Sequence, residues 1–144
     1  MIIENRVTIN APADKVFEYV ADVLRHPEWA GRPLQMKRTS DGPTGVGSTF
    51  ESTGKQFGTH TDAVRVTEYA PPSRFAIEST GDAGVMRHVF AMTESGGTTT
   101  LTKTFEMVKG SLSARIFKPV IKMVAPKDAQ ANLERIKQRV EGSA

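Results

Sequence analysis

Apolar residues in the last third of the chain recur at a helical spacing. The stripe consists of Leu112, Ile116, Val120, Val124, Ala129, Leu133, Ile136 and Val140. This pattern predicts one long amphipathic helix over Ser111–Gly142. Pro119 and Pro126 fall inside the predicted helix. Because proline lacks a backbone N–H donor, each should bend or break it.

Before that helix, apolar and polar residues alternate, which is typical of half-buried strands. Ile3, Val7 and Ile9 mark the first strand. Further strands are predicted at Gln35–Thr39, Thr59–Tyr69, Val85–Thr93 and Thr98–Val108. Another strand follows Gly47 and runs through Phe50, and one more begins with Phe75 and Ile77. Pro71-Pro72 and Gly96-Gly97 separate neighbouring strands, as expected of hairpin turns.

Two short helices are predicted between the first two strands. Asn10 is placed to cap the first of them, with Pro12 in its first turn and Val16, Phe17 and Val20 on its inner face. The second begins at Asp22 and should be stopped by Pro27, shortly before Trp29.

This order of elements predicts one α+β domain over residues 1–144: a curved antiparallel sheet of about seven strands with a long C-terminal helix. A long helix with an apolar face and no helical partner must lie across the sheet. Because a bent helix cannot close flush on a curved sheet, we expect a pocket between them.

Composition and motif spacing exclude several kinds of functional site. The chain of 144 residues has no cysteine, which excludes disulfides and thiolate ligands. His26, His60 and His88 are far apart and follow no zinc-binding spacing, and the glycine-rich GPTGVGS segment lacks the lysine of a phosphate loop. We therefore expect no metal and no cofactor. Since neither a signal peptide nor a membrane-spanning run is recognisable, we expect a cytoplasmic location.

The net charge of +3 is unevenly distributed. Residues 112–142 carry seven cations and three anions, a net charge of +4. A solvated helix face explains this most simply, and peripheral contact with an anionic membrane is a less favoured alternative. Nucleic acid is not expected as a partner, because aromatic residues do not interleave with the basic ones.

Several segments together resemble one known superfamily. They are INAPADKVFEYVADVLRHPEW, GVGSTF, VTEYAPPSRFAIES, ESGGTTTLTKTFEM and LERIKQRVE. Their order and spacing are similar to the START/Bet v 1-like (SRPBCC) superfamily, in particular its polyketide cyclase/dehydrase-type branch. The resemblance implies a helix-grip fold, in which the sheet wraps the C-terminal helix around a cavity for hydrophobic ligands such as lipids, quinones or polyketides. Fold alone does not specify a reaction.

Candidate ligand-binding residues come from the predicted inner faces. The apolar candidates are Trp29, Phe50, Phe57, Phe75, Ile77, Met86, Phe90, Phe105, Phe117, Ile121 and Val124. Among polar residues, His88 shares a strand face with Met86 and Phe90, so its imidazole is a candidate acid or base in an apolar interior. His60 and Arg65 are candidates for orienting a ligand, with Glu51 a further one.

Three functions stay open at this point. The first is binding of a small hydrophobic or amphipathic molecule between the sheet and the C-terminal helix. The second is a cyclase- or dehydratase-like enzyme that uses His88 or a strand carboxylate as acid or base. The third is a module that docks its basic helix on a membrane or a protein. A small hydrophobic partner is expected, with the chain a monomer or a homodimer.

Overall fold

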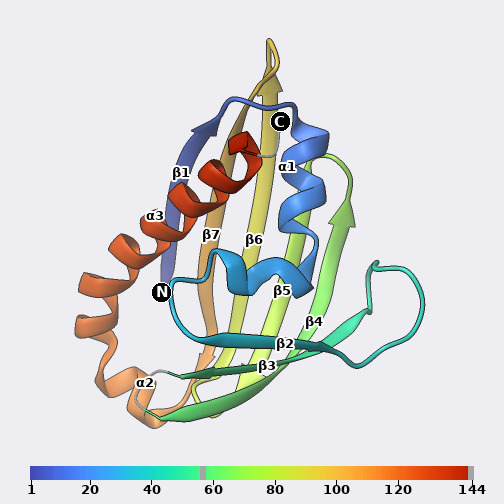
Figure 1. Ribbon diagram of the computed structural model, residues 1–144. Coiled ribbons are helices and arrows are strands. Elements are labelled where there is room, and N and C mark those ends of the chain that lie inside the picture. The colour runs from blue at the N-terminus through green and yellow to red at the C-terminus, as the bar shows by residue number, and fades with distance from the viewer. Residues whose placement is uncertain (56–57, 143–144) are drawn as a thin grey trace.

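Seven antiparallel strands form one curved sheet in the computed structural model, which describes residues 1–55 and 58–142 (Figure 1). The strands are β1 (Ile2–Ile9), β2 (Leu34–Arg38), β3 (Thr49–Lys55), β4 (Thr59–Ala70), β5 (Arg74–Gly81), β6 (Gly84–Ser95) and β7 (Thr98–Gly110). Their order is β1-β7-β6-β5-β4-β3-β2, so β1 pairs with the last strand and the others follow as hairpins. The predicted α+β class and seven-stranded sheet are confirmed.

Helices cover one face of the sheet. A short helix α1 (Ala13–Val20) and a 3-10 helix η1 (Val23–Glu28) follow β1, and α2 (Leu112–Ile116) and α3 (Lys118–Gly142) follow β7. As Figure 1 shows, α3 runs alongside β1, while α1 crosses in front of the middle strands. The covered face is the concave one.

The helix predicted over Ser111–Gly142 is divided into α2 and α3, near Pro119, where a bend or break was expected. The chain leaves the helical path at Phe117, between α2 and α3. Pro119 is then the second residue of α3, where a missing N–H costs nothing because first-turn donors have no partner within the helix. Pro126 remains inside α3, and Ser111 caps α2 by accepting a hydrogen bond from the N–H of Ala114.

Two details of the first helices also differ from the prediction. The N-cap of α1 is Pro12, which offers no side-chain cap, and the N–H of Asn10 instead donates to Glu141 on α3. Pro27 lies inside η1 rather than ending it. A short 3-10 helix tolerates proline because few of its N–H groups need an internal acceptor.

The hydrophobic core lies where α1, η1 and the C-terminal half of α3 meet the sheet. Fully buried core residues include Val16, Val20, Phe75, Phe90, Leu133 and Ile136. Burial of this kind stabilises the fold by roughly 25 cal/mol per Å² of apolar surface. This half of the concave face is therefore solid protein.

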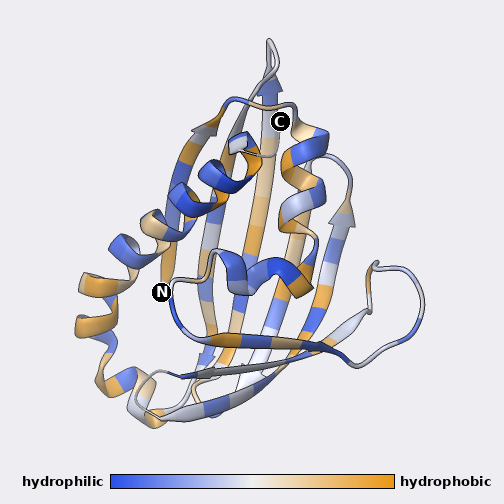
Figure 2. Cartoon of the chain, in the orientation of Figure 1, coloured by the Kyte–Doolittle hydropathy of each residue, from blue (hydrophilic) through white to orange (hydrophobic). Residues whose placement is uncertain are grey.

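The other half of the helical segment is not packed in this way. Its exposed apolar residues are Leu112, Ile116, Phe117, Val120, Met123 and Val124. Figure 2 shows them as hydrophobic turns of α2 and of the first half of α3, away from the middle of the sheet. The predicted apolar stripe is thus buried only in its C-terminal half.

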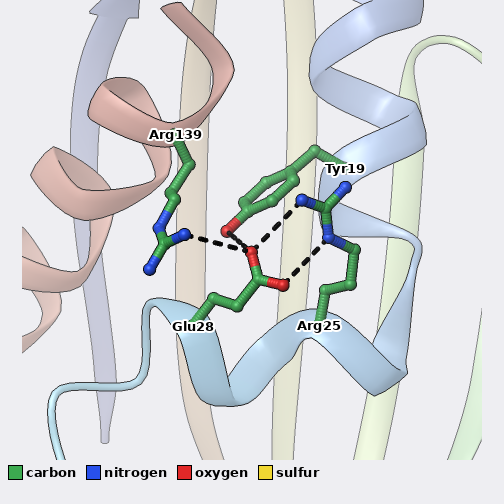
Figure 3. A network of polar contacts seen from close by, with 4 residues as sticks. All are labelled: Tyr19, Arg25, Glu28 and Arg139. Atoms are coloured by element: carbon green, nitrogen blue, oxygen red, sulfur yellow. Dashed lines mark hydrogen bonds and ion pairs between the residues drawn. The ribbon is translucent and has the colours of Figure 1, made fainter. Parts of the chain in front are cut away.

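Polar contacts hold the two halves of α3 in place. The side-chain amide of Asn5, on β1, donates to the carbonyl of Pro126 and to Gln130 Oε1, both at 3.1 Å. Further along, Glu28 on η1 accepts a hydrogen bond from the Tyr19 hydroxyl at 3.2 Å and lies 3.8 Å from Arg139 of α3 (Figure 3). Glu28 also pairs with Arg25, so one carboxylate links α1, η1 and α3.

Among the helices of residues 1–55 and 58–142, none is long and apolar enough to span a membrane.

Candidate ligand-binding site

Strands β6 and β7 supply the side chains that line the concave face between the helices. Phe90 pairs with Lys103, His88 with Phe105 and Met86 with Met107 across the two strands. Phe90 and Lys103 are buried, whereas the other four side chains keep part of their surface accessible. We call Met86, His88, Phe105 and Met107 the accessible half of the concave face. It lies toward α2, since the Met107 sulfur is close to Gly110, the last residue of β7 before that helix.

Five of the predicted ligand-binding residues are core residues. They are Trp29, Phe50, Phe75, Ile77 and Phe90, each at most 7% exposed. The ring of Phe90 packs against two of the others, with its centre 6.0 Å from that of Trp29 and 6.1 Å from that of Phe75. They form the buried end of the concave face.

The remaining apolar candidates in the described ranges divide between the accessible half and the α2–α3 segment. Met86 and Ile121 are partly buried, whereas Phe117 and Val124 are 59% and 46% exposed on the helical segment. Phe57 lies outside the described residues. Phe105, a further apolar candidate, belongs to the accessible half.

The polar candidates are not brought together. Arg65 is exposed on the convex face, paired in register with Glu78, because it alternates with the buried residues Val64 and Val66. Glu51 is likewise exposed, opposite Ala63. His60 lies with its Nδ1 3.8 Å from Asp82 Oδ2, near the β5–β6 turn. Of the expected polar groups, only His88 remains in the accessible half.

His88 is a partly buried, uncharged imidazole. Its ring centre lies 5.3 Å from that of Phe105, and neither ring nitrogen has a hydrogen-bond partner within the described part of the chain. Burial, and then the positive charge of Lys103, lowers the pKa of His88 well below 6.5. At neutral pH the ring therefore offers one donor and one acceptor, and no charge.

Sequence reasoning missed Lys103, the charged residue of this interior. Its side chain is 7% exposed, and its Nζ lies 5.6 Å from the ring centres of both Trp29 and Phe90. Burial lowers the pKa of Lys103 to about 8, with a further contribution from Arg32. The pattern did contain a signal: Lys103 is in phase with Leu101 and Phe105 on the inner face of β7.

Two buried side-chain atoms next to Lys103 lack partners. They are the indole Nε1 of Trp29 and Oδ1 of Asn5, the residue that pairs with Lys103 across β1 and β7. Unpaired buried polar atoms are uncommon in native proteins, and each calls for an explanation.

His26, by contrast, has a structural role. It is 4% exposed and its Nε2 lies 2.8 Å from the carbonyl oxygen of Val20. Burial lowers its pKa to about 4, so the neutral ring donates to that carbonyl at pH 7. The ring packs 4.8 Å from that of Trp29 and holds η1 against the sheet.

Two open hollows lie on the convex face. One, of about 630 Å³, includes Arg65, Glu51 and Glu78 in its wall, and the other, of about 570 Å³, includes Glu78, Arg87 and Glu106. Salt bridges between Arg87 and both glutamates cross the second hollow. Neither hollow lies between the sheet and α3, where the pocket was expected. No group of three or more His, Asp or Glu in the described ranges is arranged to hold a metal ion.

Solved structures share this fold across nearly their full length. TTHA0849 from Thermus thermophilus matches with a TM-score of 0.81 at 12% identity, covering 100% of this chain and 99% of that one. The Zhui aromatase/cyclase from Streptomyces sp. R1128 matches with a TM-score of 0.76 at 18% identity, covering 98% and 93%. The Aha1 dimer from Colwellia psychrerythraea matches with a TM-score of 0.68 at 15% identity, covering 98% and 96%. At such identities the likeness concerns the fold.

A search of curated protein sequences gives no significant match. The family comparison covers almost the whole chain: residues 2–141 match the model described as polyketide cyclase / dehydrase and lipid transport. This agrees with the order of motifs in the sequence and with the seven-stranded sheet and its C-terminal helix. The chain therefore belongs to the polyketide cyclase / dehydrase and lipid transport family.

Proposed function

We propose that this protein binds a small hydrophobic or amphipathic molecule, of lipid, polyketide or quinone type, between the sheet and the α2–α3 segment. The observation that carries the proposal is the accessible half of the concave face. There Met86, Phe105 and Met107 keep apolar surface accessible beside a closed core. The family description, with its cyclases and lipid transport, supports the same class of ligand.

Burial of apolar surface drives binding in this proposal, and the site imposes little shape on the ligand. Removing apolar surface from water contributes roughly 25 cal/mol per Å². Methionine side chains are flexible and polarisable, so Met86 and Met107 can adjust to ligands of different outline. His88 and Lys103 would supply the few polar contacts that orient such a ligand.

The test uses the methionine methyl groups as probes of position. The six methionines are labelled with ¹³C at their methyl groups, and the protein is titrated with 2-naphthamide, a neutral bicyclic probe. We expect the resonances of Met86 and Met107 to shift, and that of the core residue Met92, 5% exposed, to stay. Shifts confined to Met123 on the outside of α3, or no shift at all, would contradict the proposal. Native mass spectrometry of the purified protein then identifies any ligand that copurifies.

A cyclase- or dehydratase-like activity is the second candidate, favoured by the family description and by the unpartnered imidazole of His88. A base or acid with a pKa far from neutrality is a weak catalyst at pH 7. In addition, no second polar side chain hydrogen-bonds to His88 within the described part of the chain. Turnover of a model polyketide that is unchanged in His88→Ala would exclude this role.

Contact with an anionic membrane is the third candidate, and the exposed surface of α2 and α3 favours it. Between Leu112 and Lys127 there are four cations and no carboxylate, interleaved with apolar side chains that are 46–74% exposed. Such a surface is suited to the boundary of an anionic bilayer. Sedimentation with vesicles of phosphatidylserine and phosphatidylcholine should fall with added salt and in the Lys118→Glu/Lys122→Glu variant. Equal sedimentation with neutral vesicles would contradict it.

A further inference from the structure

Lys103 is a buried cation without an anion. Its ammonium lies against the rings of Trp29 and Phe90, and neither a hydrogen bond nor an ion pair from the described residues reaches it. Its charged neighbour is Arg32, which is also positive. A buried charge is costly unless it is paired, and cation–π contacts offset only part of that cost.

A second donor near Lys103 also lacks an acceptor. The indole N–H of Trp29 is buried and has no acceptor, and the ring that carries it is centred 5.6 Å from Lys103 Nζ. His88 and Lys103 lie on the same concave face, on neighbouring strands. The unpaired acceptor nearby, Oδ1 of Asn5, is neutral, so it cannot compensate an ammonium charge.

Arg32 adds a second cation at the edge of the same interior. Its positive charge lowers the pKa of both His88 and Lys103. The Arg32 guanidinium lies against Gly54 of β3, where a Cβ would lie 3.0 Å from Arg32 Nη1. No carboxylate in the described ranges raises the pKa of Lys103 or His88. The interior is therefore electropositive as well as apolar.

From this arrangement we infer that Lys103, with the indole N–H of Trp29, forms a binding site for the anionic group of an otherwise apolar ligand, a carboxylate or an ionised phenol or enol. This inference rests on the proposed function and narrows its ligand class. The apolar part of the ligand lies over the accessible half of the concave face. The anion pairs with the Lys103 ammonium, and this charge-assisted contact selects acids over neutral molecules of equal size.

The test compares two probes of the same shape. Calorimetric titration measures the affinity for 2-naphthoate and for the neutral 2-naphthamide at pH 7. We expect wild-type protein to bind the carboxylate at least tenfold more tightly. The Lys103→Met variant should lose this preference and keep its affinity for the amide. The matched control is Lys37→Met, on the exposed edge strand β2, which should behave as wild type.

A second measurement needs no variant. The chain has one tryptophan, so its indole N–H gives a single resonance in a ¹H–¹⁵N spectrum. Addition of 2-naphthoate should move that resonance downfield, as expected for a new hydrogen bond to an anion, and 2-naphthamide should move it less.

Failure of this inference can be distinguished from failure of the proposed function. Equal binding of the two probes by wild type, or a preference for the carboxylate that survives in Lys103→Met, would overturn the inference and leave the proposed function standing. Binding of neither probe would count against both. If Lys103→Met does not fold, the wild-type indole resonance decides. If it does not shift at saturating 2-naphthoate, the inference is overturned.

Discussion

The carboxylate of Glu94 accepts a hydrogen bond from the backbone N–H of Ala13 at 2.6 Å, although 81 residues separate them. Ala13 is the first residue of α1, whose N-cap Pro12 provides no side-chain acceptor. Glu94 on β6 therefore performs the task of a helix cap from another element, and its negative charge also favours the helix N-terminus.

Removal of this cap should destabilise the fold. We expect Glu94→Ala to lower the free energy of unfolding by about 1 kcal/mol, the usual loss for a helix cap. Urea denaturation followed by circular dichroism measures it. Glu51→Ala, at an exposed position of β3, is the control and should change stability little. Equal effects of the two substitutions would show that the hydrogen bond to Ala13 contributes nothing.

Glu28 should make the stability of the fold depend on salt concentration and on pH. Its hydrogen bond with Arg25 lowers the pKa of Glu28, and Tyr19 and Arg139 act in the same direction. The stabilisation is present above pH 4.5, the usual pKa of a glutamate, and is lost as the pH falls through the lowered value. Because the side chain is 31% exposed, we expect Glu28→Gln to cost only about 0.5–1 kcal/mol at low salt.

The measurement for Glu28 is the salt dependence of urea unfolding at pH 7. The difference between wild type and Glu28→Gln should shrink in 1 M sodium chloride, where the Debye length is about 3 Å. A difference that is the same at both salt concentrations would mean that charge is not what joins α1, η1 and α3.

Buried histidine should make the fold acid-sensitive. Burial lowers the pKa of His26 to about 4, whereas an exposed imidazole titrates near 6.5. As the pH falls, the unfolded chain therefore binds a proton before the folded one does. Stability is complete above about pH 6.5 and is lost between pH 6.5 and 4, by about 3 kcal/mol from this residue.

His88 contributes to this loss in the same direction, since burial also lowers its pKa. Unfolding free energies at pH 7, 6 and 5 should fall in wild type and fall less in His26→Phe. The double variant with His88→Phe should show the flattest profile. If the double variant kept the full slope of wild type over this range, the assignment to the two histidines would be wrong.

Asn5 should control how firmly the middle of α3 is held. The Asn5→Ala substitution removes the hydrogen bonds to Pro126 and Gln130, at a cost of about 1–2 kcal/mol. In Asn5→Ala, we expect hydrogen exchange to become faster than in wild type mainly in residues 122–130. Residues 133–140 should change less, because their apolar side chains are in the core. Asn132→Ala, which removes a contact to Arg135 within the helix, is the control. Uniform acceleration along α3 in Asn5→Ala would contradict a local anchor.

The strands and their faces follow from the sequence because the period of a strand is two. Val64 and Val66 alternate with Arg65, and the same alternation identifies which residues face the core. Strict use of this alternation would have placed Arg65 on the convex face and Lys103 on the concave face. The turns at Pro71-Pro72 and Gly96-Gly97 are local features, so they too were predictable.

The sequence by itself determined the order of the elements, the antiparallel hairpins and the family, because these depend on local spacing and on motif order. Only the tertiary structure decided which residue caps α1, where the C-terminal helix breaks and which half of the concave face stays accessible. Glu94 meets Ala13, and Trp29 meets Lys103, only after the sheet has curved and η1 has packed on it. Contacts between residues so far apart depend on how the elements are placed in space, and no pattern of period two or 3.6 carries that information.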